Sequence, residues 1–428
     1  MIMGRERLAE MSSRSAAPQR GAGAGVDLGP GAPWAVAEVF AGVGSVAHGF
    51  ARAAGFEVAY LNDIDPLARD TYRTNFGQHA RYDLRDVKDV TAATILEAAD
   101  GRPMAGLLGC PPCQGWSAAG QRDAGDPRNL LLGDFFRLVT DIKPLFFVME
   151  NVPSVCDREE LAAALRALAP QYRTWHGVLN AAAYGLPQSR QRTIVIGYRS
   201  DTGVIPTPPP PTHAGKRRVW DYRTEQLVRP TPDLLDSLLG AAPRIGVRKA
   251  AGHSMRQHYP ADLAALADFV TVGDAVGDLD AESPRRVSAY GRRLRGSTSD
   301  PQNHRPWGHG RQLIDRMRLV PEGGRPPAEA TNQRRYYSQA YTRLHRRGMA
   351  RTITTNFHNP GSGRFLHYRL PRTLTVREAA RLQGFTDDFV FVGHASGQER
   401  LVGNAFPPLW AEQIARHVAA ELGEALHR

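Results

Sequence analysis

The chain has 428 residues and a hydrophobic fraction of 42%, which is enough for a sizeable core and a smaller second unit. It has no run near the roughly 18–20 apolar residues of a membrane span, no apolar signal core after its first charges, and only three cysteines, so we expect a soluble, non-secreted protein from a reducing compartment. The net charge of +11 favours a polyanionic partner, and most of the excess falls in residues 200–350.

The first predicted elements follow a tail, residues 1–33, whose Gly, Ala, Ser and Arg show no hydrophobic period. Across residues 34–205, short β-rich runs alternate with amphipathic segments. The runs read VAEVF, EVAYL, AGLLG, LFFVM and TIVIG. Such alternation is typical of a parallel sheet with helices on both faces. We therefore predict a disordered tail followed by an α/β domain.

A proline tract, PTPPPPT at residues 206–212, ends the alternation and is expected to run as a stiff linker. Residues 206–350 are basic, rich in Gly and Pro, and lack a clear period, which predicts a loop-rich domain shaped for contact. Within this domain, residues 213–270 form an apparent insertion, to which we assign no role. Regular structure returns over residues 351–428, with TVREAARLQGF and an amphipathic C-terminal helix.

A glycine-rich turn, FAGVGS at residues 40–45, lies between the first run and its helix. Glycines there let the backbone turn sharply and let a ligand approach closely. NDID follows the second run, and Asp63 or Asp65 could accept hydrogen bonds from the ribose of a nucleoside cofactor. Alternatively, the glycines make a tight turn and the aspartates cap the next helix. Asp83, after a third possible run, could bind an adenine amino group.

The segment GCPPCQGWS follows the run AGLLG, at the edge where open α/β sheets place their sites. Its Cys110 and Cys113 could form a redox pair or half of a zinc site. With one further cysteine and no closely spaced pair of histidines, neither usual zinc pattern is complete. The glycines between Gly115 and Gly125 instead predict a loop that closes over a substrate.

Charged residues adjoin the next two runs. Glu150 follows LFFVM and places a carboxylate at the same sheet edge as Cys113, unless it is simply solvated. Arg190 and Arg192 precede TIVIG, and their spacing of two predicts a shared face. They could contact a base or a phosphate, or pair with acidic side chains.

In this order, the blocks FAGVGS, NDID, PPCQGWS, MENV, YGLPQSRQR, RTLTVREAARLQGF and GNAFPP resemble the cytosine-5 DNA methyltransferase family of the bacterial type. They cover about residues 36–198 and 350–422. The resemblance implies a Rossmann-like S-adenosylmethionine-dependent methyltransferase sheet with helices on both faces. It also implies a smaller target-recognition domain at 206–350, and a return to the catalytic domain at 351–428. S-adenosylmethionine is the implied cofactor, double-stranded DNA the implied partner, and the bacterial cytoplasm the implied location.

The resemblance also implies roles for the matching residues. Cys113 would be the nucleophile, Glu150 and Arg192 would hold a flipped cytosine, and Arg190 would support them. Family members commonly have Glu where this chain has Asp63 and Gly where it has Ser45, which puts cofactor affinity rather than the chemistry in doubt. The residues expected to bind the cofactor are Phe40, Gly42, Gly44, Asp63, Asp83, Leu84 and Asn404.

The implied reaction transfers a methyl group to carbon 5 of a cytosine in a specific duplex sequence. Addition of the Cys113 thiolate to carbon 6 makes carbon 5 electron-rich, and the base must first leave the stack. We expect a monomer in a restriction-modification or regulatory methylation system, with a cognate restriction endonuclease as a candidate partner. Candidates for DNA contact in the basic segment are Arg292, Arg293, Arg295, Arg334, Arg335, Tyr336 and Tyr337.

Three alternatives remain at this point. The first is a transfer-RNA cytosine-5 methyltransferase, against which the long basic segment favours duplex DNA. The second is a catalytically silent DNA-binding protein, against which the intact Cys113, Glu150 and Arg192 argue. The third is a redox protein, which predicts a disulfide between Cys110 and Cys113.

Overall fold

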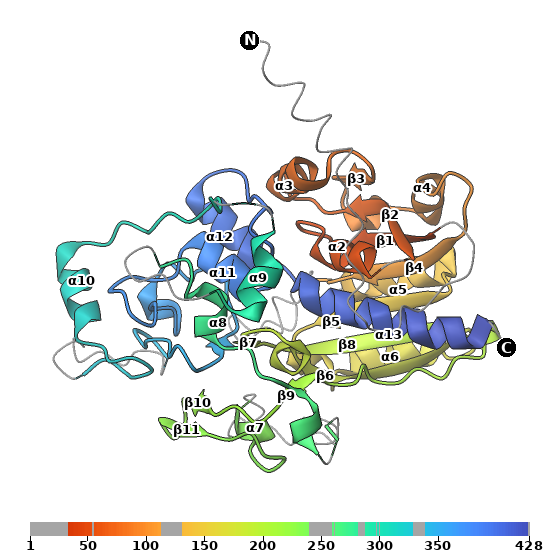
Figure 1. Ribbon diagram of the computed structural model, residues 1–428. Helices are drawn as coiled ribbons and strands as arrows, with labels where there is room; N and C mark the ends of the chain where they lie inside the picture. Colours follow the sequence, from red (N-terminus) through yellow and green to blue (C-terminus); the bar gives the residue numbers. More distant parts are fainter. Residues whose placement is uncertain are drawn as a thin grey trace, which may run out of the picture.

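A seven-stranded sheet forms the centre of the molecule (Figure 1). The computed structural model describes residues 33–53, 55–112, 131–238, 259–260, 262–280, 287–296, 298, 300–327 and 339–426. The strand order is β3-β2-β1-β4-β5-β8-β6. The strands are β1 (Trp34–Val39), β2 (Phe56–Asn62), β3 (Arg81–Asp83), β4 (Met104–Gly109), β5 (Phe146–Asn151), β6 (Tyr172–Asn180) and β8 (Gln191–Arg199).

The sheet is mixed rather than purely parallel. Strands β1 to β5 pair in parallel, as predicted. Strand β8 pairs antiparallel with both β5 and β6, so the prediction of an all-parallel sheet is wrong for β8. The link between β6 and β8, residues 181–190, is shorter than the dozen or so residues of a parallel crossover. The chain therefore turns back on itself at this point.

Helices cover both faces of the sheet, which confirms the predicted α/β class (Figure 1). Alternate residues of β5 serve the two layers because successive side chains of a strand point to opposite faces. Phe146 and Val148 pack in the core under α2 and α13, whereas Phe147 and Met149 pack under α5 and α6. The covering helices are α2 (Ser45–Arg52) and α13 (Pro408–Leu426) on one face, and α4 (Ala92–Glu97), α5 (Leu131–Ile142) and α6 (Glu159–Leu168) on the other.

A second part of the molecule lies beside the sheet and is built from short elements (Figure 1). The end of the chain contributes to both parts, because α11 packs on α8 whereas α13 packs on α2. The domain limits predicted from the sequence stay a prediction, and residues 1–32 of the predicted tail lie outside the described residues. The elements are β7 (Gln188–Ser189), β9 (His213–Ala214), β10 (Val219–Asp221), β11 (Gln226–Val228), α7 (Leu235–Leu238), β12 (Ala267–Asp268), α8 (Val272–Val276), α9 (Ala289–Arg295), α10 (Arg311–Arg318), β13 (Ala350–Arg351), α11 (Val376–Leu382) and α12 (Ala395–Asn404).

Helix α11, the core of the block RTLTVREAARLQGF, joins the elements of this second part. It begins at a reciprocal cap, in which Glu378 N donates to Thr375 Oγ1 at 3.1 Å and Thr375 N donates to Glu378 Oε2 at 2.9 Å. The fully buried Arg381 pairs with Asp387 at 2.5 Å and with Asp278 at 2.6 Å. This block is therefore a structural junction. Among the described helices, none has the length and apolar character that crossing a bilayer requires.

Candidate active site

The carboxyl ends of β1, β2 and β3 meet at one edge of the sheet. Ala41 N donates to Asn62 O at 2.9 Å, and Gly42 N donates to the Asp63 carboxylate at 2.8 Å. Asp63 N in turn donates to Asp83 O at 3.1 Å. The glycine-rich turn, Asp63 and Asp83 are thus brought together, at the edge where open α/β sheets bind their ligands.

The turn after β1 needs glycine at Gly44 and leaves space above Gly42. Both have positive φ angles, 70° and 52°, and the preceding Phe40 also lies in the left-handed region. A Cβ on Gly44 would lie 2.6 Å from the ring of Tyr72. A Cβ on Gly42 would meet no atom within 4 Å in the part of the chain that the structure describes. The turn is therefore tightly packed at Gly44, against Tyr72, and open at Gly42, where a ligand could approach.

Asp63 and Asp65 divide the two roles that the sequence left open. Asp65 caps α3 (Pro66–Phe76) by accepting from Leu67 N at 3.0 Å, and it pairs with Arg400 at 2.6 Å. Asp63 accepts from Gly42 N and from Asp65 N, and burial raises its pKa against the effect of these bonds. The capping interpretation holds for Asp65, whereas Asp63 links the two ligand-facing loops.

Of the remaining predicted cofactor residues, Asp83 ends β3 and Leu84 follows it at this edge, whereas Asn404 lies on α12. Asp83 accepts from Tyr60 Oη at 3.0 Å and pairs with Arg85; burial alone would raise its pKa, but the Arg85 hydrogen bonds outweigh burial and lower it. Leu84 packs partly buried against a small aromatic cluster, and Asn404 is an exposed residue at the end of α12.

The sequence analysis missed two residues at this edge. Ile64, between the two aspartates, is 69% exposed, which is unusual for a large apolar side chain and would suit a stacked base. Glu38 on β1 is buried and accepts from Ala47 N at 2.7 Å, and burial raises its pKa to about 8. The signal for Glu38 was a lone charge inside the apolar run VAEVF.

Glu150 and Arg192 form an ion pair across β5 and β8. Arg192 Nε lies 2.6 Å from Glu150 Oε1, and both side chains are largely buried. The two groups are not aligned for a hydrogen bond. Glu150 Oε1 is buried and makes no hydrogen bond within the described residues. Arg192 Nη1 donates to Gln191 O at 2.7 Å. Glu150 Oε1 is thus buried and held by the charge of Arg192 rather than by an aligned hydrogen bond.

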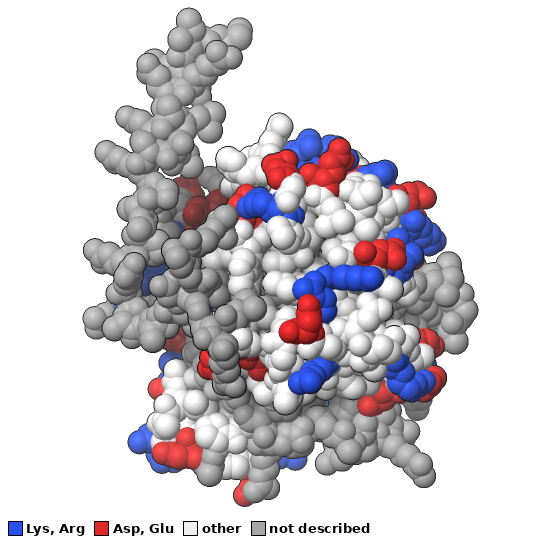
Figure 2. All heavy atoms as spheres, turned by 90° about the vertical axis from the view of Figure 1, so that its right-hand side faces the viewer, with Lys and Arg blue, Asp and Glu red and all other residues white. Residues whose placement is uncertain are grey.

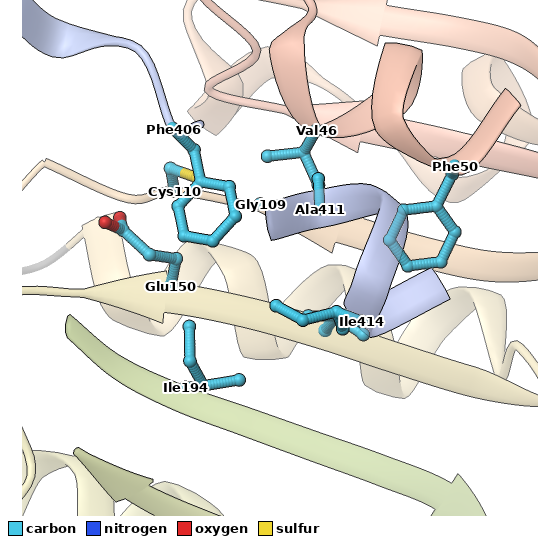
Figure 3. A pocket seen from close by; sticks show the side chains of 10 residues that line it. Val46, Phe50, Gly109, Cys110, Glu150, Ile194, Phe406, Ala411 and Ile414 are labelled. Carbon is cyan, nitrogen blue, oxygen red and sulfur yellow. The ribbon is translucent and has the colours of Figure 1, made fainter. Parts of the chain in front are cut away.

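Glu150 also lines a small pocket with Cys110 and Phe406, and Figure 3 shows the three side chains close together. The pocket joins the ends of β4 and β5 to the segment before α13. Burial raises the pKa of the Cys110 thiol well above its usual range, and the carboxylates of Glu150 and Glu38 add to the rise. Cys110 is free and stays a thiol, so it is unsuited to nucleophilic attack.

Cys113 and the glycine loop that follows it lie outside the described residues. The chain leading to Cys113 is described up to Pro112 and is tied to the end of β5, because Asn151 Nδ2 donates to Pro111 O at 3.1 Å. Arg190 is buried, and its Nη1 donates to Ile353 O at 3.4 Å. The positive charges of Arg190 and Arg192 both act to lower the pKa of Cys110, against the larger effect of burial.

The predicted DNA-contact residues on α9 have partners within the protein. Arg293 pairs with Glu412 at 3.2 Å, Arg295 pairs with Asp278 at 2.8 Å, and Arg292 donates to a backbone carbonyl. Arg334, Arg335, Tyr336 and Tyr337 lie outside the described residues. The face on the right of Figure 1 carries interspersed charges of both signs (Figure 2), so the basic excess is not gathered there.

Comparisons with known proteins agree with this arrangement. A family model described as C-5 cytosine-specific DNA methylase matches residues 34–420. The type II methyltransferase M1.HphI of Haemophilus parahaemolyticus is 31% identical over 392 residues, covering 89% of this chain and 85% of that protein. M.DdeI of Desulfomicrobium norvegicum is 27% identical over 418 residues, covering 90% and 88%. A solved DNA modification methyltransferase from an E. coli prophage has the same fold, with a TM-score of 0.64 at 24% identity, covering 91% of this chain and 99% of that one.

Proposed function

The chain belongs to the C-5 cytosine-specific DNA methylase family and is a DNA cytosine methyltransferase, and we propose that Cys113, Glu150 and Arg192 carry out its reaction on a cytosine flipped out of a specific duplex sequence. The observation that carries this assignment is the buried pair of Glu150 and Arg192, with an oxygen of Glu150 left without a hydrogen bond. A carboxylate beside a guanidinium offers both acceptors and donors to the edge of a neutral, polar base.

The edge formed by β1, β2 and β3 is the proposed binding site for S-adenosylmethionine, the methyl donor of the family. The open space above Gly42 suits the methionine part of such a molecule. The Asp63 carboxylate suits its ribose, and the exposed apolar Ile64 suits its base. When bound, S-adenosylmethionine supplies a methyl group on a positively charged sulfur, which an electron-rich carbon can attack. The remaining residues proposed for this site are Phe40, Gly44, Asp83, Leu84 and Asn404.

Cys113 is the proposed nucleophile. Carbon 5 of cytosine is poorly nucleophilic, and addition of the Cys113 thiolate to carbon 6 raises its electron density. Loss of the carbon 5 proton after methylation lets the carbon–sulfur bond break and restores the ring. A cysteine suits this task because part of it is thiolate at neutral pH, and nearby arginines increase that part.

Glu150 and Arg192 orient the base and stabilise the adduct. The Glu150 carboxylate accepts from the exocyclic amine of cytosine, while Arg192, whose Nε lies 2.6 Å from Glu150 Oε1, donates to the ring carbonyl. Arg190 supports the pair from its buried position against Ile353. Extrusion of the base costs a few kcal/mol, which DNA contacts from the second part must offset.

The test is methyl transfer from labelled S-adenosylmethionine to DNA, with two cysteine variants. We expect Cys113→Ser to abolish label transfer and Cys110→Ala to retain most of it, since Cys110 is a buried thiol. Sequencing 5-methylcytosine in cells that express the chain identifies the methylated site. Equal loss in both variants would favour a cysteine pair acting together and contradict the assignment.

A setting in restriction-modification follows from the relatives, which are named type II methyltransferases. We propose that the chain acts as a monomer and protects the site that a cognate endonuclease cuts. Plasmid DNA from expressing cells should then resist one endonuclease of matching specificity. Full cleavage by every enzyme that recognises the methylated site would argue for regulatory methylation instead.

A further inference from the structure

Arg351 is a half-buried cation beside the segment that carries the two site arginines. It ends β13, which pairs in parallel with β7, and its register partner is Ser189, the residue before Arg190. Backbone contacts fix this arrangement, because Ala350 N donates to Pro187 O at 2.8 Å. Figure 1 shows β7 at the junction of the sheet and the second part. Arg351 thus lies on the strand that pairs with β7, next to the segment of the two site arginines.

The guanidinium of Arg351 has no counter-ion in the part of the chain that the structure describes, where it makes neither an ion pair nor a hydrogen bond. A second cation lies near it, since Arg364 sits 4.1 Å over the ring of Tyr222. Burial lowers the pKa of Arg364 to about 10, and the charge of Arg351 acts in the same direction. Asp221 lines the same pocket as Arg351, and the charge of Glu225 acts on Arg364. Arg351 itself, however, has no ion pair among the described residues, so its charge favours the binding of an anion.

The pocket beside Arg351 is short of acceptors. Ser189, Trp220, Tyr222 and Met349 line it together with Arg351. The indole N–H of Trp220 is buried and has no acceptor among the described residues. The Asp221 carboxylate, which also lines the pocket, already accepts from Arg223 N at 2.9 Å and from Thr224 Oγ1 at 3.2 Å. A ligand here has to bring acceptor oxygens of its own.

We propose that Arg351 binds a backbone phosphate of the target strand next to the flipped cytosine. A flipped nucleotide rotates about its backbone, so its phosphates stay beside the pocket that receives the base. Ser189, the partner of Arg351, lies three residues before Arg192, which at about 3.3 Å per residue is no more than roughly 10 Å. This is the scale of one nucleotide. The inference rests on the proposed function.

The experiment measures binding of a fluorescent duplex containing the methylated site at several salt concentrations. Each phosphate contact contributes about 0.9 to the slope of log affinity against log salt. We expect Arg351→Gln to bind more weakly and to lower that slope by about this amount, whereas Arg351→Lys keeps the slope. The matched control is Arg166→Gln on α6, which removes one charge from an exposed pair with Glu159 and should leave the slope unchanged.

Two outcomes would overturn the proposal. One is an unchanged slope for Arg351→Gln. The other is a relaxed requirement at one base of the site with the slope intact, which would make Arg351 a base-contacting residue. Failure of the wild-type protein to methylate any cytosine would instead contradict the proposed function, so the two failures are distinguishable.

Discussion

Glu150 is suited to hold a neutral base because its side chain is largely buried and the charge of Arg192 compensates its own. Arg192 offsets its charge at 2.6 Å, yet the geometry leaves an oxygen without a hydrogen bond among the described residues. Glu150 could be placed from the sequence, because it follows an apolar run that ends at the same sheet edge as the run before Cys113. Arg192 precedes its run, so it reaches Glu150 only because β8 is antiparallel to β5, which the sequence analysis did not predict. Glu38 carries a signal in the sequence, since it is the lone charge of an apolar run. Its hydrogen bond with Ala47 N could not be predicted, because Ala47 reaches it only after the turn has formed.

Glu38 predicts a specific dependence of stability on pH. Burial raises its pKa from 4.5 to about 8, so the folded state favours the protonated carboxyl. Its stabilising contribution is therefore complete below about pH 4.5 and is lost as the pH rises through 8. We expect the free energy of unfolding to fall between these limits by about 1.4 kcal/mol per pH unit from this group. Glu38→Gln should remove that slope in chemical denaturation measured from pH 5 to 9.

The matched control is Glu57→Gln, because Glu57 is an exposed residue whose pKa is lowered by its hydrogen bond with Arg102. Its pH profile should follow that of the wild-type protein. Asp63 and Tyr72 also lie within electrostatic reach of Glu38, so the isosteric change keeps the shape of their surroundings and removes one negative charge. Parallel profiles for wild type and Glu38→Gln would show that Glu38 does not titrate in this range.

At the scale of elements, the apolar runs predicted the strands well but not the direction of β8. A run of five apolar residues looks the same in either direction, and the short link from β6 decides the outcome. The block RTLTVREAARLQGF was recognised as a helix, but its junction role came from Arg381 and its distant acids. The local hydrophobic pattern thus predicts the helix, whereas its role in joining other elements depends on ion pairs with residues that the pattern does not show.

The contact between α2 and α13 predicts a strong effect at Gly49. A Cβ there would lie 2.4 Å from Ala411 Cβ and 2.6 Å from Pro408 O, so the helices would have to separate. Gly49→Ala should destabilise the protein by about 1–3 kcal/mol. Cofactor affinity should also fall, because α2 begins directly after the turn at Gly44. Thermal unfolding and titration with S-adenosylmethionine measure the two effects.

Gly133 on α5 gives the opposite control. A Cβ at this helical position meets no described residue within 4 Å. Gly133→Ala should therefore stabilise the protein, by about 0.5–1 kcal/mol, because alanine favours the helix. If Gly49→Ala raises the melting temperature as Gly133→Ala does, helix propensity rather than the contact between α2 and α13 governs the effect at Gly49.

At the scale of the whole molecule, Glu412 connects the sheet with the second part. It lies on α13 and pairs with Arg52 of α2 at 3.3 Å, with Arg293 of α9 at 3.2 Å, and with Arg416 at 2.9 Å. Arg52 and Arg293 are 360 and 119 residues away in the sequence. Periodicity and motifs report on neighbours along the chain, so this junction could not be predicted from them.

Glu412→Gln tests whether this junction orients the second part for DNA. The change removes a negative charge and frees Arg293, so electrostatics alone would strengthen DNA binding. If the junction sets the orientation, binding should weaken instead, with little change in affinity for S-adenosylmethionine. Glu159→Gln makes the same change of charge at an exposed pair and should bind DNA at least as well as wild type. Tighter binding by both variants would mean that Glu412 contributes charge but not orientation.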